Sequence, residues 1–258
     1  MGGVDAVFAK PFADQVEYFS GKLALPTAAW DDIAGAAHDR AFMVAGAQSI
    51  DLLADLYDAV SQAITEGKSI GWFRQQFAGI VARHGWTGWT GSESAAGAAW
   101  RTRIIYRANM ATSYAAGRWA QLNDPALAEL RPYWRYVHSD LVAHPRPLHK
   151  AWHGLVLHKD HPFWRTHFPP NGWGCECRVV AASRADIEAA KAKSLFGEPP
   201  AGWDTPDPDT GLLPGIDRGW DHAPGANLNT DLRALFHARV ATLPGPLADA
   251  FRAYLSQA

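Results

Sequence analysis

The sequence predicts a mainly helical α+β fold. It has a helical N-terminal half, a long central helix, a small antiparallel sheet among Cys/His-rich loops, and a C-terminal pair of helices. Two observations carry this prediction. Apolar residues recur every three or four positions through most of the first 125 residues, and from Pro132 onwards the pattern changes to short, histidine-rich pieces broken by prolines. The change divides the chain into a helical region (1–125), a motif region (126–197) and a Pro/Gly-rich extended arm with C-terminal helices (198–258).

Five helices are expected in the first region. Serine or threonine can cap the start of a helix, and a glycine or a proline commonly marks its end. On these signals and the apolar spacing, we expect helices over 11–22, from Thr27 through Ala37, over 47–66, from Ser69 to Gly85, and over 93–122.

Two strands are expected in the motif region. Residues 133–138 alternate in polarity, and residues 177–181 follow the cysteines as a second strand-like run, so we expect the two to pair in an antiparallel sheet. Ser183 and Asp186 resemble a capping box that opens another helix. Residues 198–226 are expected to form an extended arm that becomes ordered on a partner, and two helices, 230–242 and 246–256, are expected to follow it.

Composition narrows the classes of function. The formal net charge is −2, which gives no bulk attraction to nucleic acid or to an anionic membrane. No stretch approaches the roughly 20 apolar residues that span a bilayer, and the N-terminus lacks a signal-peptide pattern. We therefore expect a protein of the cytoplasm, with its two cysteines reduced or bound. The 12 tryptophans favour broad packing surfaces and interfaces. Four arginines on the long helix form either a phosphate-facing stripe or a solvated, salt-bridged face: Arg101, Arg103, Arg107 and Arg118.

A cluster of histidines and cysteines carries the chemical information. Seven of the 11 histidines lie between His138 and His167, and both cysteines follow closely. Thiolate and imidazole together suit a tetrahedral zinc ion. If zinc binds, the best ligands are His149, Cys175 and Cys177, with His167 or His153 as the fourth.

Several features bear on this zinc hypothesis. His149 and His153 are four residues apart, which places both rings on one face of a helical turn. Gly172 and Gly174 permit the turn that two cysteines in Cys-x-Cys spacing need in order to converge. The alternative is that the histidines are hydrogen-bonded side chains that hold a loop-rich region together without metal. A disulfide between the cysteines is disfavoured, because so short a ring strains the bond.

The motif region also resembles a known family. The runs Pro145-Arg-Pro-Leu-His149, Asp160-His-Pro-Phe-Trp164 and His167-Phe-Pro-Pro-Asn-Gly-Trp-Gly-Cys-Glu-Cys-Arg178 resemble the hallmark of the phage Mu F-like minor head proteins, a head-morphogenesis family of tailed double-stranded DNA phages. The preceding helix, Arg107 to Arg118, and residues 216–225 are similar to that family as well. The positions that match its pattern are Arg146, His149, Gly154, Asp160, Trp164, Pro169, Pro170, Gly172, Trp173 and Arg178.

The resemblance implies a low-copy structural protein that acts in capsid assembly and is not an enzyme. It implies a place inside the virion head, reached from the host cytoplasm during assembly. The implied partners are the portal protein and the major capsid or scaffold proteins, with packaged DNA as a further contact, and with no membrane and no small-molecule substrate. Since Arg146 and Asp160 both belong to the pattern and neither suits zinc beside the cysteines, we expect them to form a buried or half-buried ion pair.

Two other functions remain as alternatives. A metal-dependent hydrolase or nuclease would use the histidine cluster, with Glu176 or Asp160 as general base, but no His-Glu-x-x-His spacing is present. A DNA-binding module is disfavoured by the acidic balance and by the lack of a recognisable docking motif.

Overall fold

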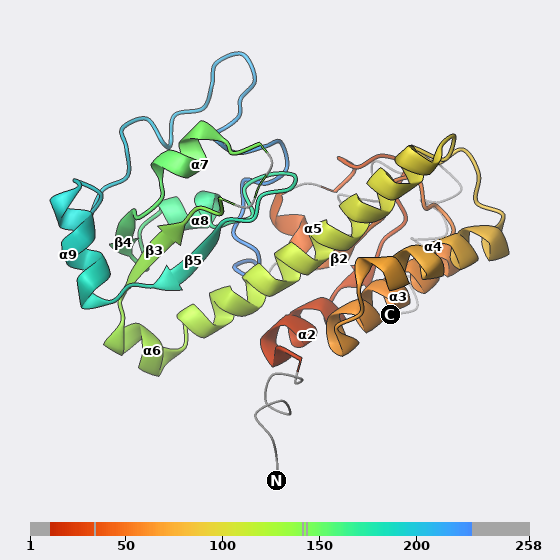
Figure 1. Cartoon of the computed structure of the whole chain (residues 1–258), viewed down its shortest axis with the longest axis horizontal. Helices are drawn as coiled ribbons and strands as arrows, with labels where there is room; N and C mark the ends of the chain where they lie inside the picture. The colour runs from red at the N-terminus through yellow and green to blue at the C-terminus, as the bar shows by residue number, and fades with distance from the viewer. Residues whose placement is uncertain (1–10, 34, 141, 143, 229–258) are drawn as a thin grey trace, which may run out of the picture.

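The long helix α5 (Ala95–Leu122) connects two lobes in the computed structural model, which describes residues 11–228 apart from 34, 141 and 143. On one side of α5 lies a lobe of helices, and on the other lies a lobe built on a small sheet (Figure 1). The C-terminal helices expected over 230–242 and 246–256 lie outside the described residues. No helix within the described ranges combines the length and apolar character needed to cross a membrane.

The helical lobe contains α2 (Ala13–Ser20), α3 (Ile50–Glu66) and α4 (Ile70–His84). Helices α3, α4 and α5 each begin with a serine whose side chain accepts a backbone N–H of the first turn: Ser49, Ser69 and Ser94. Helices α3 and α4 each end at a glycine in the left-handed conformation, Gly67 and Gly85. These four helices were expected from the sequence and are confirmed.

The prediction of a helix from Thr27 through Ala37 is wrong. The segment contains turns and the start of the 3-10 helix η1 (Gly35–Asp39), and it lies between two short strands that pair in parallel, β1 (Leu23–Ala24) and β2 (Ala41–Phe42). The carboxylate of Asp32 accepts hydrogen bonds from the backbone N–H groups of Ala28 (2.7 Å) and Ala29 (3.0 Å). These two bonds hold the start of the segment in a turn around Asp32.

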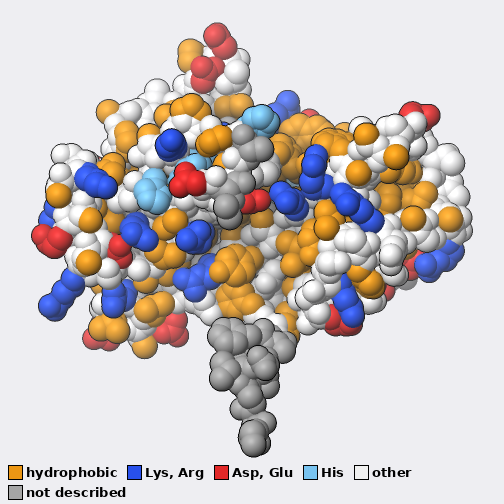
Figure 2. Space-filling view, viewed as in Figure 1, with side chains coloured by type: hydrophobic (Ala, Val, Ile, Leu, Met, Phe, Trp, Pro, Cys, Tyr) orange, Lys and Arg blue, Asp and Glu red, His pale blue; other side chains and the backbone are white. Residues whose placement is uncertain are grey.

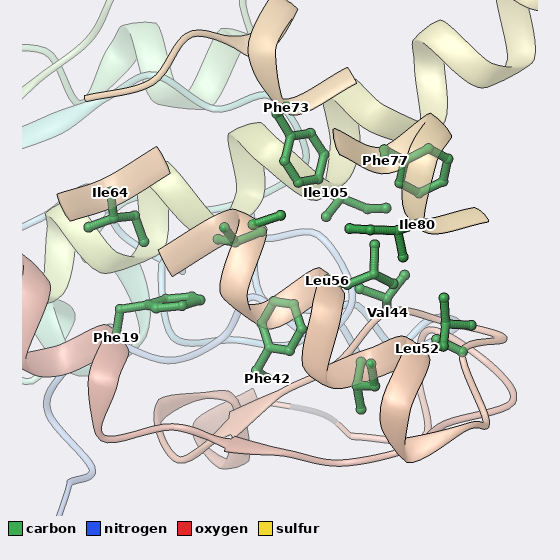
Figure 3. Close-up of a cluster of buried hydrophobic side chains, with 14 residues drawn as sticks. Phe19, Phe42, Val44, Leu52, Leu56, Ile64, Phe73, Phe77, Ile80 and Ile105 are labelled. Carbon is green, nitrogen blue, oxygen red and sulfur yellow. The ribbon is translucent and has the colours of Figure 1, made fainter. Parts of the chain in front are cut away.

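One core lies inside the helical lobe, where side chains from α3, α4 and α5 meet Phe19 and Phe42 (Figure 3). Leu53, Leu56 and Val60 on α3 are fully buried there. Their spacing of three and four residues places them on one face of the helix, as the sequence pattern predicts.

The packing of α2 on α5 depends on Gly117. A Cβ atom at this position would lie 2.6 Å from the Phe12 ring and 2.9 Å from the backbone nitrogen of Gln15. We expect Gly117→Ala to lower the free energy of unfolding by about 1–3 kcal/mol through overpacking. On α4, a Cβ at Gly79 would meet no described atom within 4 Å, so Gly79→Ala should instead stabilise by about 0.5–1 kcal/mol. Urea unfolding followed by circular dichroism measures both, and equal shifts in the two variants would contradict the close approach.

The sheet lobe contains three antiparallel strands in the order β4 (Val156–His158), β3 (Tyr133–Val137), β5 (Arg178–Ala181). The register pairs Trp134 with Ala181 and Val137 with Arg178, which confirms the expected pairing. The strand β4 was not expected, because three residues are too few to show a pattern.

Four short helices surround this sheet: α6 (Pro125–Leu130), α7 (Pro147–Ala151), α8 (Phe163–His167) and α9 (Arg184–Ala192). The expected capping box of Ser183 and Asp186 is present at the start of α9.

Tryptophans build much of the core of the sheet lobe. Trp134, Trp152 and Trp164 are almost fully buried, and Trp134 lies edge-on to Trp119 with ring centroids 5.3 Å apart. The sequence interpretation of the tryptophans as interface residues can therefore apply only to those with exposed side chains. Among the described residues, the tryptophans with strongly exposed side chains are Trp30, Trp100 and Trp173.

The segment 198–226, expected to be an extended arm, is only partly one. Residues around 203–212 project from the sheet lobe as a loop that carries exposed acidic residues (Figures 1 and 2). From residue 213 the chain turns back, and Ile216, Trp220 and Ala223 enter the core of the sheet lobe. The backbone N–H of Gly225 then donates to Asp39 of the helical lobe at 2.8 Å. The second half of the arm therefore packs on the chain's own core and joins the two lobes.

Candidate metal centre

His149, Cys175 and Cys177 lie together beside the sheet. The Nδ1 atom of His149 is 3.6 Å from the Sγ atom of Cys175 and 3.8 Å from that of Cys177, and these three atoms all lie within 4.8 Å of one another. Histidine side chains also appear on the surface of the sheet lobe (Figure 2), but His149 itself is only 2% exposed. The trio expected from the sequence is therefore brought together.

Local sequence explains how the trio converges. Pro147 begins α7, where its ring suits the first turn, and this helix carries His149 inward. On the other side, the N–H of Cys175 donates to the carbonyl of Gly172 at 3.1 Å, and Gly174 has a φ of 71°. The left-handed glycine provides the bend expected for Cys-x-Cys, and both sulfurs face His149.

The two cysteines titrate as a pair. The pKa of the Cys177 thiol is lowered, chiefly because Cys175 donates a hydrogen bond to its sulfur. The pKa of Cys175 is raised, because its proton is held by the Cys177 sulfur and because its side chain is buried. The arrangement thus favours a thiolate at Cys177, the form of cysteine that binds metals.

His149 is held in one orientation. Its Nε2 atom is 2.7 Å from the carbonyl oxygen of Gly215, and its ring stacks on Trp152 with centroids 5.4 Å apart. A carbonyl oxygen only accepts, so Nε2 carries a proton and donates. In the neutral imidazole, the Nδ1 lone pair then points at the two sulfurs.

His153 and His167 were expected as the fourth ligand, but neither is grouped with His149, Cys175 and Cys177 in the structure. His153 is exposed, and its Nδ1 accepts the backbone N–H of His138 at 3.2 Å. His167 is buried, its Nδ1 lies 2.8 Å from the hydroxyl of Thr166, and burial lowers the pKa of His167 to about 4.

The sequence reasoning missed His138, whose Nδ1 is 3.4 Å from the sulfur of Cys177. The sequence predicts that residues 133–138 pair with 177–181 but not the register of the pairing, and it is the register that places His138 opposite Cys177.

The prediction of an ion pair between Arg146 and Asp160 is wrong. Arg146 binds Asp217 instead, with Nη2 and Oδ2 2.5 Å apart and both side chains 31% exposed. The same carboxylate accepts the backbone N–H of Trp173 at 2.9 Å. Asp160 lies on the surface, where its side chain is 67% exposed and binds Lys159. After residue 213 the chain returns to the sheet lobe and brings Asp217 to Arg146. Asp217 therefore forms the ion pair that was predicted for Asp160.

The remaining motif positions shape the same region. A Cβ atom on Gly172 would collide with the carboxylate of Asp217, and Gly154 has a φ of 90°. Buried Trp164 donates from its indole nitrogen to the carbonyl of His158 at 3.0 Å. Pro169 and Pro170 are buried and joined by a cis peptide bond, while Arg178 is exposed at the start of β5.

The arginines of α5 do not form one stripe. Arg101 is buried and donates to the carbonyl of Ala45. Arg107 pairs with Glu176 at 3.3 Å, and Arg118 donates to the side chain of Gln121 at 2.5 Å. Arg103 is exposed. The solvated or salt-bridged alternative therefore describes Arg103, Arg107 and Arg118 better than a phosphate-facing stripe, and buried Arg101 fits neither.

A cavity of about 790 Å³ lies between the two lobes. Its lining includes the exposed rings of Trp30, Trp100 and Trp173. Trp30 and Trp173 meet edge to face with centroids 6.2 Å apart, and the Arg218 guanidinium lies 6.0 Å from the Trp30 ring. The cavity thus offers large aromatic surfaces to solvent.

Comparison with known proteins identifies the family. The family described as Phage Mu protein F like protein matches residues 54–180, from α3 through β5. A protein of Escherichia phage Mu that is named for capsid assembly, protein F, is 35% identical over 195 residues, which cover 72% of this chain and 44% of the phage Mu protein. The FluMu F protein of a Mu-like prophage in Haemophilus influenzae is 35% identical over 175 residues, or 66% of this chain and 42% of its own length.

The chain thus matches less than half the length of these relatives. No solved structure matches it. With a third of the residues identical over most of its length, the chain belongs to the phage Mu F-like protein family.

Proposed function

We propose that this chain is a structural protein of a phage head and acts in capsid assembly. The observation that carries the proposal is the 35% identity over 195 residues to a phage Mu protein named for that role. The family match over residues 54–180 includes the trio of His149, Cys175 and Cys177. We further propose that the protein is a minor component inside the prohead, close to the portal or scaffold, and that it meets packaged DNA there.

The rims of the cavity between the lobes supply the surface for these contacts. Aromatic rings dominate the central, desolvated parts of protein interfaces, because they bury a large area at a small entropic cost. Trp30 and Trp173 remain more than a third exposed in the isolated chain. We therefore assign to this pair of rings the contact with another head protein.

A double variant tests that contact. Trp30→Ala with Trp173→Ala is expected to fold but to be incorporated into proheads several-fold less than the unmodified chain, because each ring truncated at an interface centre costs more than about 1 kcal/mol of binding. Leu130→Ala is the matched control, since Leu130 is 74% exposed on α6 and does not line the cavity. Quantitative mass spectrometry of purified proheads, after chemical cross-linking, measures both incorporation and the portal or scaffold neighbour. Equal incorporation of the two variants would remove this surface from the proposal.

A structural role also fits the chemistry of the cluster better than hydrolysis does. Catalytic zinc needs an open position and a nearby general base. His149 and Cys175 are 2% and 6% exposed, which leaves little room for a substrate. Of the two proposed bases, Glu176 pairs with Arg107 and Asp160 pairs with Lys159 on the surface. Nuclease activity of the purified chain that disappears in Cys177→Ser would favour the enzymatic alternative.

A further inference from the structure

We propose that His149, Cys175 and Cys177 bind one Zn²⁺ ion in a closed structural site and that His138 supplies the fourth ligand. The ion would join the end of β3, the helix α7 and the loop that precedes β5. This proposal concerns the fold of the motif region and does not depend on a role in the phage head.

The spacing of the donor atoms fits a tetrahedral ion. With bonds of about 2.3 Å to sulfur and about 2.0–2.1 Å to nitrogen, neighbouring N and S ligands of one tetrahedral zinc lie about 3.6 Å apart. The His149 Nδ1 atom is 3.6 Å and 3.8 Å from the two sulfurs, and the His138 Nδ1 atom is 3.4 Å from Cys177. The donors of the trio are thus already close to the separations that one shared ion requires, and His138 already lies close to Cys177.

Hydrogen bonding alone cannot join both sulfurs to His149. Because Nε2 of His149 donates to Gly215, a neutral His149 has a single lone pair on Nδ1. That lone pair can accept one S–H group, yet it faces two sulfurs at nearly equal distances. A metal ion placed between the three atoms uses the lone pair and both sulfurs at once. The contact to Gly215 then becomes the outer hydrogen bond that orients most metal-binding histidines.

His138 is the histidine best placed to complete the site. It follows directly on β3, opposite Cys177, and it is 5% exposed. Its Nε2 atom is buried without a hydrogen-bond partner among the described residues, although the Asp140 carboxylate is 3.8 Å away. Since His138 lies outside the mutual 4.8 Å of the other three, its ring must turn toward them when the ion binds.

The low exposure of three of the four ligands favours a structural site. His138, His149 and Cys175 are each less than a tenth exposed, so water and substrates have little access to the ion. Four protein ligands and no open position are typical of structural zinc. In their described residues, the loops between 138 and 177 contain only short helices and one short strand, so an ion in their midst would fix their arrangement.

Metal content and spectroscopy test the proposal on the full chain. Purified under reducing conditions, the unmodified protein is expected to contain close to one zinc per chain by elemental analysis. Titrated with Co²⁺ after zinc removal, it should show the intense absorption of tetrahedral cobalt with thiolate ligands. Cys175→Ser and Cys177→Ser should lose most of the metal and the thiolate bands. His158→Gln, an exposed histidine outside the cluster, should keep both.

Each outcome decides a part of the proposal. Little zinc in the unmodified protein, together with no tetrahedral cobalt spectrum, would overturn it. Full zinc content in both folded cysteine variants would place the ion elsewhere and overturn it as well. If the cysteine variants fail to fold, the cobalt spectrum of the unmodified protein still decides. His138→Gln is expected to weaken zinc binding at least several-fold in a competition with a chelator, and unchanged affinity would overturn His138 as the fourth ligand.

Discussion

Replacing Trp134 with alanine is expected to lower the free energy of unfolding by about 3–5 kcal/mol, the range for removing a large aromatic side chain from a core. Trp134 is fully buried on β3, with ring centroids 5.3 Å from Trp119, 5.8 Å from Trp164 and 5.9 Å from Phe168. The cavity left by the indole would remove contacts from three other rings at once, and the short helices of this lobe have little freedom to close it.

Trp100→Ala provides the comparison for Trp134→Ala. The Trp100 side chain is 41% exposed, so its loss should change stability by no more than about 0.5 kcal/mol, as for most surface positions. Chemical denaturation monitored by circular dichroism gives both values. Similar losses in the two variants would show that the sheet lobe does not rest on the packing described for Trp134.

Asp217→Ala is expected to destabilise the protein by about 2–4 kcal/mol. The change leaves the half-buried Arg146 guanidinium and the backbone N–H of Trp173 without their carboxylate. Removing one partner from a fully buried ion pair costs about 3–5 kcal/mol, and the partial exposure of this pair reduces the effect.

Asp160→Ala separates the observed pair from the pair expected on sequence grounds. Because Asp160 is 67% exposed, we expect its loss to cost no more than about 0.5 kcal/mol. A double-mutant cycle should find coupling between Arg146→Ala and Asp217→Ala, and additivity between Arg146→Ala and Asp160→Ala. The reverse result would restore the sequence-based pairing and contradict the position of Asp217.

Local signals explain most of what the sequence predicted. Ser49, Ser69 and Ser94 at helix starts, with Gly67 and Gly85 at helix ends, act within one turn of themselves, so they can be recognised without knowing the fold. The same holds for the capping box at α9 and for the left-handed glycine beside the cysteines. The helix expected from Thr27 is not formed among the described residues, where the Asp32 carboxylate accepts the N–H groups of Ala28 and Ala29 in a turn.

The candidate site was predictable only in part, because its remaining contacts are long-range. The trio follows from residue chemistry, but the partner of Arg146 lies 71 residues further along the chain. Its choice depends on how residues 213–223 return to the core, and the high content of proline and glycine there gave no sign of that return. His138 was overlooked as a ligand because it is 39 residues from Cys177 in the sequence. The register of β3 and β5 brings the two residues together.

Quantitative mass spectrometry of purified proheads and virions tests directly whether the protein takes part in head assembly. The protein is expected in proheads, at a copy number well below that of the major capsid protein. Its presence would follow from the family membership shown by the 35% identity to the phage Mu protein. Absence of the protein from both proheads and virions would contradict a structural role in the phage head.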